Sequence, residues 1–251
     1  MPSRRSPLLL ALVAASLLAS SLGQGCAHGA SPPAVEQEAP PEPAVEADPC
    51  AFHERLIPYG DERCRLTMEY LAQHHPGMAA GTVPASCTLD PRMIVLHWTG
   101  GDSLDSAWNT FAPLRLAGRP DLQAAGAVNV SAHFLVDRDG SIQQLVPENR
   151  VARHVIGLNH VAIGVENVGG TAPAPLTDAQ VEADIALVRC LAARHPITHL
   201  IGHHEYRQME RHPYFQEADP TYRTAKADPG PEFMARVRAG VGDLGLRGAE
   251  P

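Results

Sequence analysis

Apolar runs separated by polar turns recur along the chain and predict the strands of a sheet. The first run is MIVLHW at residues 93–98, and similar β-branched runs lie within 160–169 and 197–203. Residues 132–147 contain two further runs joined at Asp139-Gly140, a dipeptide typical of hairpin turns. The run within 160–169 is long enough for a central strand.

Segments with helical spacing of apolar residues alternate with these runs. We predict helices over residues 61–75, 103–116, 177–195 and 232–241. Thr177 and Gln180 form a capping-box signature at the start of the third helix. Residues 206–230 contain several prolines, many charges and no clear period, so we expect a long functional loop there. The alternation predicts an α/β fold, with a central mixed β-sheet flanked by helices on both sides.

Composition narrows the class of protein. The chain has 251 residues, of which 44% are hydrophobic, enough for one good-sized core. A net charge of −8 leaves no basic surplus to neutralise phosphates, so we expect no nucleic-acid partner. We place the folded domain at residues 51–245.

The first 50 residues have the composition of an export signal and a tether. Arg4 and Arg5 precede an apolar run at 8–22 that is short and rich in Ala and Ser, so we interpret residues 1–25 as a signal peptide. The stretch LGQGC is similar to a bacterial lipobox and predicts a lipid anchor on Cys26; the alternative is a plain cleaved signal. Residues 26–50 are dominated by Pro, Ala and Glu and predict an extended tether.

Four cysteines remain beyond Cys26, and an even number in an oxidising compartment permits two disulfides with three connectivities. A bond between Cys50 and Cys64 is favoured because its loop is short. Cys190, set in an apolar helix, is alternatively buried and free. None of the four has CxxC spacing, so we assign them no catalytic role.

Three potential zinc ligands stand where the chain changes direction. His97 ends the first strand, His203 ends the last, and Asp228 lies in the stretch KADPG. Ligands at strand ends can converge at one edge of a sheet, so we expect a zinc site in a groove there. Zinc held by three protein ligands leaves a fourth position for water, whose pKa it lowers. Taken singly, a histidine at a strand end and a DPG turn are also common structural features.

Four separated stretches carry a family resemblance: IVLHWTGG, SAHFLVDRDGSIQQLVPENRVARHVIGLNHVAIGVENVGG, LIGHHEY and YRTAKADPGPEF. Together they resemble the zinc-dependent N-acetylmuramoyl-L-alanine amidases of type 2, relatives of the peptidoglycan recognition proteins. The resemblance runs from about Arg63 to Arg238 and keeps the family's order of motifs.

The resemblance implies a role for each matching residue. His97, His203 and Asp228 match the zinc ligands, Glu166 in IGVEN matches the general base, and Lys226 matches the lysine that stabilises the oxyanion. A carboxylate within an apolar run is costly to bury without a partner, which independently singles out Glu166.

Other histidines receive lesser roles. His154 matches a histidine of a WH motif near the site and is a candidate substrate contact, although Arg153 replaces the tryptophan. His133 is expected in the core or behind the ligands, because a fourth protein ligand would close the metal site to water. His204 is excluded as a ligand. The remaining histidines interpreted as structural or surface residues include His74, His75, His195, His199 and His212.

The implied activity is hydrolysis of the amide between N-acetylmuramic acid and L-alanine, with peptidoglycan or muropeptides as partners. Together with the leader, it implies an exported, periplasmic protein anchored to the outer membrane. Two alternatives remain: a peptidoglycan-binding module without activity, and a zinc hydrolase that cleaves another amide.

Overall fold

The structure, a computed structural model, describes residues 50–79 and 86–249. The predicted signal peptide, Cys26 and almost all of the tether lie outside these residues. Within the described residues, no helix combines the length and apolar character needed to cross a bilayer.

In the described part of the chain, six strands form one mixed sheet in the order β1-β4-β3-β5-β2-β6. The strands are β1 (His53–Glu54), β2 (Met93–Trp98), β3 (Phe134–Val136), β4 (Ile142–Gln144), β5 (Ala162–Asn167) and β6 (His199–Gly202). Only β3 and β4 pair antiparallel, as the hairpin expected at Asp139-Gly140, while β3, β5, β2 and β6 run parallel. The mixed sheet expected from the sequence is confirmed.

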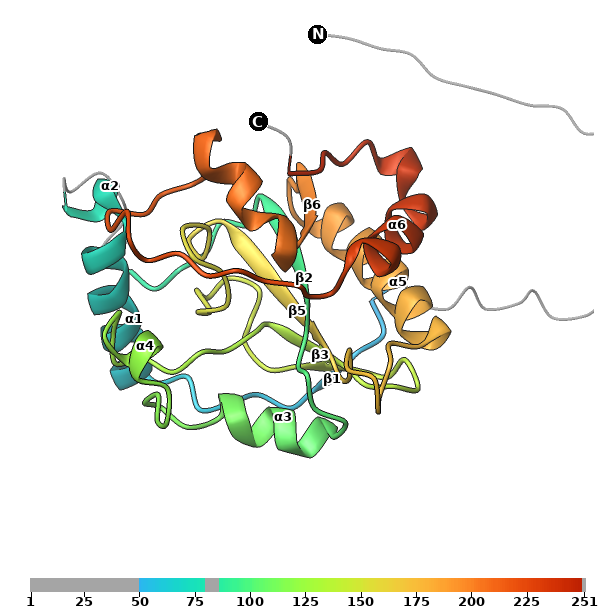
Figure 1. The fold of residues 1–251 in the computed structure, drawn as a ribbon, viewed down its shortest axis with the longest axis horizontal. Helices are drawn as coiled ribbons and strands as arrows, with labels where there is room; N and C mark the ends of the chain where they lie inside the picture. The colour runs from blue at the N-terminus through green and yellow to red at the C-terminus, as the bar shows by residue number, and fades with distance from the viewer. Residues whose placement is uncertain (1–49, 80–85, 250–251) are drawn as a thin grey trace, which may run out of the picture. The chain divides into compact units, whose positions relative to one another are not determined.

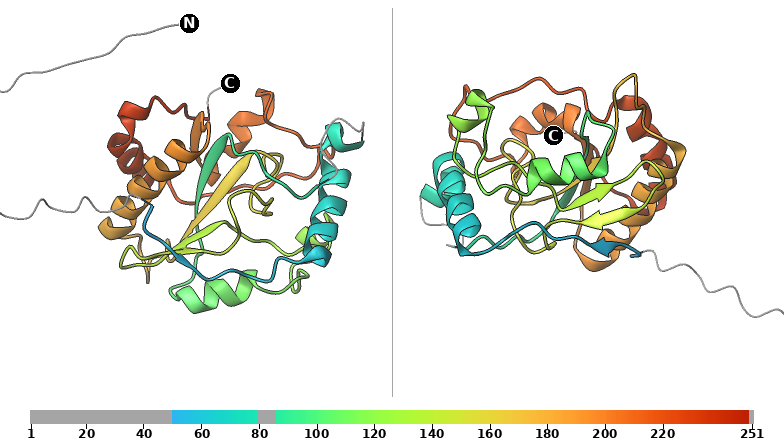
Figure 2. Two further views of the ribbon diagram at one scale, coloured as in Figure 1. Left: turned by 180° about the vertical axis from the view of Figure 1, so that it is seen from behind. Right: turned by 90° about the horizontal axis from the view of Figure 1, so that it is seen from below.

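The helices of the described chain lie around this sheet (Figure 1). They are α1 (Asp61–His74), α2 (Pro76–Ala79), α3 (Leu104–Phe111), α4 (Pro120–Gln123), α5 (Asp178–Arg194) and α6 (Pro231–Gly240), with 3-10 helices η1 (His203–Arg211) and η2 (Gly242–Leu244). Figures 1 and 2 show α5 and α6 together on one side of strands β2 and β5, and α1 on the other.

The four predicted helices are confirmed, with ends that differ by a few residues. Thr177 and Gln180 form the expected capping box at the start of α5. The long loop predicted for 206–230 is only partly correct, because η1 extends as far as Arg211. The 3-10 turns of η1 lack the apolar period by which the sequence reveals an α-helix.

Alternation along the strands divides the core into two faces. Ile94 and Leu96 of β2 lie in one cluster with apolar residues of α5 and α6. Met93 and Val95 point the other way, into a cluster with Tyr206 of η1. Because both faces are covered, β2 is a fully buried central strand.

Two disulfides fasten the first described residues to this core. Cys50 is bonded to Cys190 of α5, and Cys64 of α1 is bonded to Cys87. The favoured pairing of Cys50 with Cys64 is therefore wrong, and Cys190 is not free. Loop length alone was a poor guide, because β1 pairs with β4 at the edge of the sheet and Cys50, just before β1, meets α5 there.

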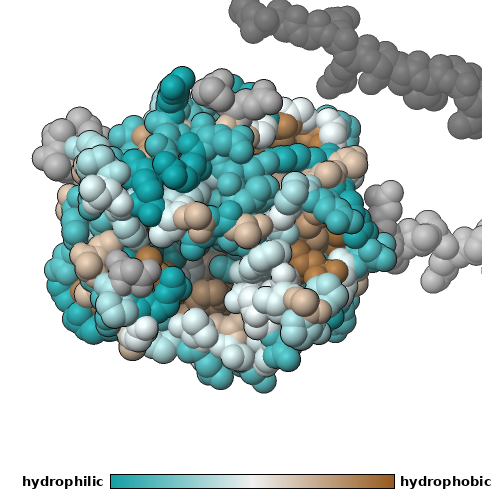
Figure 3. Space-filling model, viewed as in Figure 1, coloured by the Kyte–Doolittle hydropathy of each residue, from teal (hydrophilic) through white to brown (hydrophobic). Residues whose placement is uncertain are grey.

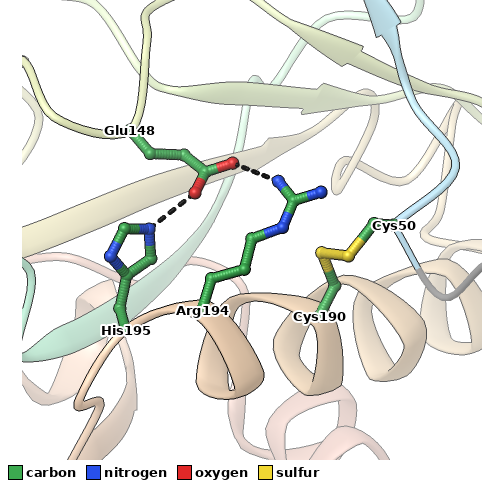
Figure 4. Close-up of a disulfide and its surroundings, with 5 residues drawn as sticks. All are labelled: Cys50, Glu148, Cys190, Arg194 and His195. Atoms are coloured by element: carbon green, nitrogen blue, oxygen red, sulfur yellow. Dashed lines mark hydrogen bonds and ion pairs between the residues drawn. A yellow bond between two sulfur atoms is a disulfide. The ribbon is translucent and has the colours of Figure 1, made fainter.

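Figure 4 shows the first of these disulfides beside the end of α5. Glu148 there accepts hydrogen bonds from Arg194, at 2.9 Å, and from His195, at 2.6 Å. The final turn of α5 is thus tied both to the start of the domain and to the segment after β4.

Candidate metal and catalytic site

The carboxyl ends of three neighbouring parallel strands, β5, β2 and β6, lie at one edge of the sheet. His97 is the fifth residue of β2, and in the register of the sheet it lies opposite Glu166 of β5. His203 follows the last residue of β6 on the other side of β2. Parallel strands point the same way, so residues distant in sequence meet at this edge.

A loop brings Asp228 to the same place. The backbone N–H of His204 donates to the carbonyl oxygen of Asp228 at 2.8 Å. Further back, the hydroxyl of Tyr206 donates to the carbonyl of Thr224 and accepts from the N–H of Thr224, both at 2.8 Å. The loop is thereby fixed to η1 on either side of Lys226.

The three predicted ligands converge on one point. His203 Nδ1 lies 2.9 Å from His97 Nδ1 and 2.9 Å from Asp228 Oδ2, and the latter two atoms are 3.3 Å apart. The residues are 1%, 6% and 8% exposed in the order His97, His203, Asp228. Lone pairs directed at one another over such distances repel unless a proton or a cation lies between them.

The donor set fits a transition metal. Tetrahedral zinc with ligands about 2.0–2.2 Å away needs donor atoms roughly 3.3 Å apart, close to the separations seen here. His97, His203 and Asp228 form the one group of three metal-ligating side chains that the described residues bring together in this way. Two imidazoles and a carboxylate are also a donor set that zinc accepts in catalytic sites.

Burial and charge perturb the titration of these groups. Burial, followed by the neighbouring His97, lowers the pKa of His203 to about 3. Burial alone would raise the pKa of Asp228, but the adjacent imidazoles of His203 and His97 hold it well below its usual range. Both shifts favour a neutral imidazole and an ionised carboxylate, the forms that bind a metal.

Glu166 stands beside the cluster without belonging to it. Its Oε1 lies 4.0 Å from His97 Nδ1, and its side chain is 12% exposed. Its Oε2 is buried and has no hydrogen-bond partner. Burial, and then the charge of Asp228, raise the pKa of Glu166 well above its usual value, while Lys226 acts in the opposite direction. A carboxylate with a raised pKa beside the cluster is suited to take up and release a proton.

The site opens into a cavity of about 360 Å³. Its walls include the five predicted catalytic and metal-binding residues together with His154, and residues of α3 and α4. Figure 3 shows a hollow near the centre of this face, with hydrophobic and neutral residues on its floor and hydrophilic residues above. Glu166, Lys226 and the metal-ligand cluster therefore face the same cavity.

The lesser histidines also have definite places. His133 is fully buried, with its Nε2 donating to the carbonyl of Arg150 and its Nδ1 accepting from the N–H of Gly164, which confirms it as a core residue. His204 turns its Nδ1 towards the carbonyl of Asp228, not into the cluster. His154 lines the cavity, and burial together with His97 lowers its pKa well below the usual value.

Arg153 has a function that the sequence did not suggest. It is 4% exposed and donates to the carbonyl oxygens of Leu122, Val128 and Gly126 at 2.7, 2.8 and 3.0 Å. Its guanidinium carbon lies 4.5 Å from the ring centroid of Tyr70. Arg153 therefore holds the wall of the cavity from within. An arginine within the largely apolar stretch VARHVI was the available signal.

Asn167 and Asp184 form a second support that sequence patterns did not reveal. The Nδ2 group of Asn167 donates to Asp184 Oδ2 of α5 at 3.0 Å and to the carbonyl oxygen of His97 at 3.3 Å. This contact joins the helix layer to the backbone of a metal-ligand candidate.

The fold and the site define an α/β protein with a buried His–His–Asp cluster suited to a transition metal. The chain belongs to the N-acetylmuramoyl-L-alanine amidase family, whose family model matches residues 88–231, more than half of the chain. The matched region contains all six predicted site residues.

Curated relatives agree with this assignment. The chain is 35% identical over 170 residues to the 1,6-anhydro-N-acetylmuramyl-L-alanine amidase AmpD of Citrobacter freundii, covering 60% of this chain and 80% of that protein. It is 24% identical over 151 residues to peptidoglycan recognition protein 3 of Mus musculus, a match that covers 59% of this chain and 44% of that protein. The endolysin of Escherichia phage T7 is 35% identical over 85 residues, covering 32% and 56%. The chain thus spans about half the length of the last two relatives.

Solved structures with likeness to this chain include the N-acetylmuramoyl-L-alanine amidase LysC of Clostridium intestinale URNW and a Se-Met derivative of AmpD. LysC has a TM-score of 0.42 and 26% identity, over 63% of this chain and 88% of LysC. The AmpD derivative has a TM-score of 0.45 and 25% identity, over 76% and 94%. Membership of the family rests on the sequence match.

Proposed function

We propose that this protein is an exported, zinc-dependent amidase that hydrolyses the bond between N-acetylmuramic acid and L-alanine in peptidoglycan or its fragments. One observation carries the proposal: His97, His203 and Asp228 converge within 4.8 Å of one another at the wall of a cavity that also contains Glu166 and Lys226. The relationship to AmpD, a 1,6-anhydro-N-acetylmuramyl-L-alanine amidase, supports this choice of bond.

A zinc ion held by His97, His203 and Asp228 would supply Lewis acidity at the amide and a more acidic water beside it. The carboxylate of Glu166, in the wall of the cavity, accepts the proton of the attacking water and returns it to the leaving nitrogen. A C–O bond forms at the carbonyl carbon, the C–N bond breaks, and the proton ends on the amine of L-alanine. Lys226 places a positive charge where the carbonyl oxygen becomes negative.

The main alternative is a peptidoglycan-binding module without activity, as the relationship to peptidoglycan recognition protein 3 suggests. Binding alone requires neither a three-donor cluster nor a buried, unpartnered carboxylate beside it. Their presence together favours the enzyme.

Glu166→Gln tests the proposal most directly, because the amide keeps the shape of the side chain and cannot accept the proton. We expect zinc content to be unchanged and turnover of purified sacculi to fall about 10²- to 10⁴-fold. Glu69→Gln, on the exposed surface of α1, is the matched control and should retain full activity. Undiminished turnover by the Glu166 variant removes this residue from the role of base.

His97→Ala should lose both bound zinc and turnover, whereas His53→Ala, at an exposed position of β1, should lose neither. Mass spectrometry of the products separates the remaining alternative. Intact stem peptides with a free L-alanine amine support the amidase, and cuts within the peptide support a hydrolase of another amide. Wild-type protein that binds sacculi but releases nothing is a binding module.

Export and anchoring are also proposals, carried by the sequence of residues 4–26. Cell fractionation should find the protein with the outer membrane and a Cys26→Ser variant in the soluble periplasmic fraction. Membrane association that survives the substitution contradicts a lipid anchor on Cys26.

A further inference from the structure

The ring of His154 is held in one place by its surroundings. Its imidazole packs against the backbone of Gly164 on β5, where an added Cβ would lie 2.6 Å from the His154 Cγ. The backbone N–H groups of His154 and Val155 both donate to Oδ1 of Asn159, at 2.8 and 2.9 Å. Only glycine at position 164 leaves room for this ring.

Both ring nitrogens of His154 are engaged inside the protein. Nε2 lies 3.1 Å from the carbonyl oxygen of Ala162, and Nδ1 lies 3.1 Å from Nε2 of His97. A carbonyl oxygen only accepts hydrogen bonds, so Nε2 of His154 carries the proton and donates it. In the neutral ring, Nδ1 then offers a lone pair towards His97.

This arrangement fixes the tautomer of His97. The lone pair of His154 needs a donor, so His97 carries its proton on Nε2 and leaves Nδ1 unprotonated. That Nδ1 is the atom that faces His203 Nδ1 at 2.9 Å and Asp228 Oδ2 at 3.3 Å. A histidine that binds a metal through one nitrogen needs a partner of this kind at the other.

We infer that His154 is a positioning residue that sets the tautomer and ring orientation of His97 for metal binding, so that its ring nitrogens are not available to hydrogen-bond substrate. The inference rests on the proposed metal site but not on the proposed reaction. Partners of metal-ligating histidines typically contribute about 10- to 100-fold in metal affinity.

Two substitutions at position 154 distinguish the effect of the hydrogen-bond acceptor from the effect of the ring's volume. His154→Leu removes both nitrogens, while His154→Asn retains an oxygen acceptor near the place of Nδ1. We expect zinc affinity, measured by competition with a chromophoric chelator, to fall about 10- to 100-fold in the Leu variant. The Asn variant should recover most of that loss. His199→Leu, at a fully buried histidine whose ring packs against His212 and does not line the cavity, is the control and should bind zinc as the wild type does.

Wild-type affinity in the Leu variant overturns the inference, and so does an equal loss in the Leu and Asn variants. If the Leu variant does not fold, the tautomer can be measured directly in the metal-free wild type. Nitrogen-15 spectra of the imidazoles should show His97 protonated at Nε2, and protonation at Nδ1 overturns the inference. None of these measurements requires substrate. A protein that shows all the expected metal behaviour and leaves sacculi intact disproves the amidase proposal alone.

Discussion

Replacing Asp184 with asparagine should change how the stability of the protein depends on pH. Asp184 is 1% exposed, on the face of α5 that packs against the sheet. Its Oδ2 accepts from Asn167, whose amide also reaches the backbone carbonyl of His97, while its Oδ1 is buried without a partner. Burial raises the pKa of Asp184 from 3.8 to about 7, and the hydrogen bond from Asn167 only partly opposes it.

Whether stability rises or falls with pH depends on which state, folded or unfolded, keeps the proton on Asp184. Between the ordinary pKa of 3.8 and the folded value of about 7, the folded protein retains the proton on Asp184 and the unfolded chain has released it. Stability therefore falls as pH rises through this window, by about 1.4 kcal/mol for each pH unit. Over the whole window the loss is about 4 kcal/mol, and it stays constant above pH 7. Asparagine at position 184 cannot ionise and is free of this penalty.

Denaturant unfolding of the oxidised, chelator-treated wild type and the Asp184→Asn variant at several pH values between 4 and 8 provides the measurement. Other ionisable groups titrate alike in both proteins, so their effects cancel in the difference. We expect the free energy of unfolding of the variant to increase steadily relative to that of the wild type up to about pH 7. The reasoning is refuted if the difference in unfolding free energy is the same at pH 4.5 and pH 7.5.

Three further outcomes are expected. Cys50→Ser combined with Cys190→Ser opens a disulfide loop with a sequence separation of 140, so the free energy of unfolding should fall by up to about 5 kcal/mol, and an unchanged denaturation midpoint contradicts this. Gly170 has a φ of +95°, and an added Cβ would lie 2.2 Å from the Trp98 ring. Gly170→Ala should therefore destabilise the protein by about 1–3 kcal/mol. It should also shift the fluorescence of Trp98, measured in a Trp108→Phe background, and unaltered emission argues against the contact. Zinc added to chelator-treated protein should raise the melting temperature in proportion to the logarithm of its concentration, whereas magnesium should not.

The part of the site that lies on strands was predictable because strand patterns are local. The run MIVLHW shows in six residues both the buried strand and the histidine near its end, and His203 follows β6 in the same way. Glu166 could be singled out because a carboxylate within an apolar run calls for a special environment. Asp228 and Lys226 lie in an irregular loop without a local structural pattern, so only the resemblance of the stretch KADPG to the family motif predicted their roles.

Contacts between distant segments could not be predicted in this way. Nothing near Cys50 in sequence indicates that β1 lies beside β4, and this pairing decides which cysteine it meets. The support from Asn167 to Asp184 likewise depends on how α5 is set on the sheet, because the two side chains belong to different layers. A single sequence shows which residues are present but not which distant residues contact one another.

The segment before the family match supports the site from outside the matched region. Helix α1 ends before residue 88, yet Nδ1 of His74 lies 2.8 Å from Glu217, and the carbonyl of His74 accepts from the backbone N–H of Ala218 at 2.6 Å. Both partners precede Lys226 on the loop that continues to Asp228. The bond between Cys64 and Cys87 ties α1 to the segment that precedes β2. This helix therefore fixes one end of the loop, while η1 fixes the other. The loop that contains two of the candidate site residues is therefore held by a helix that lies outside the family match.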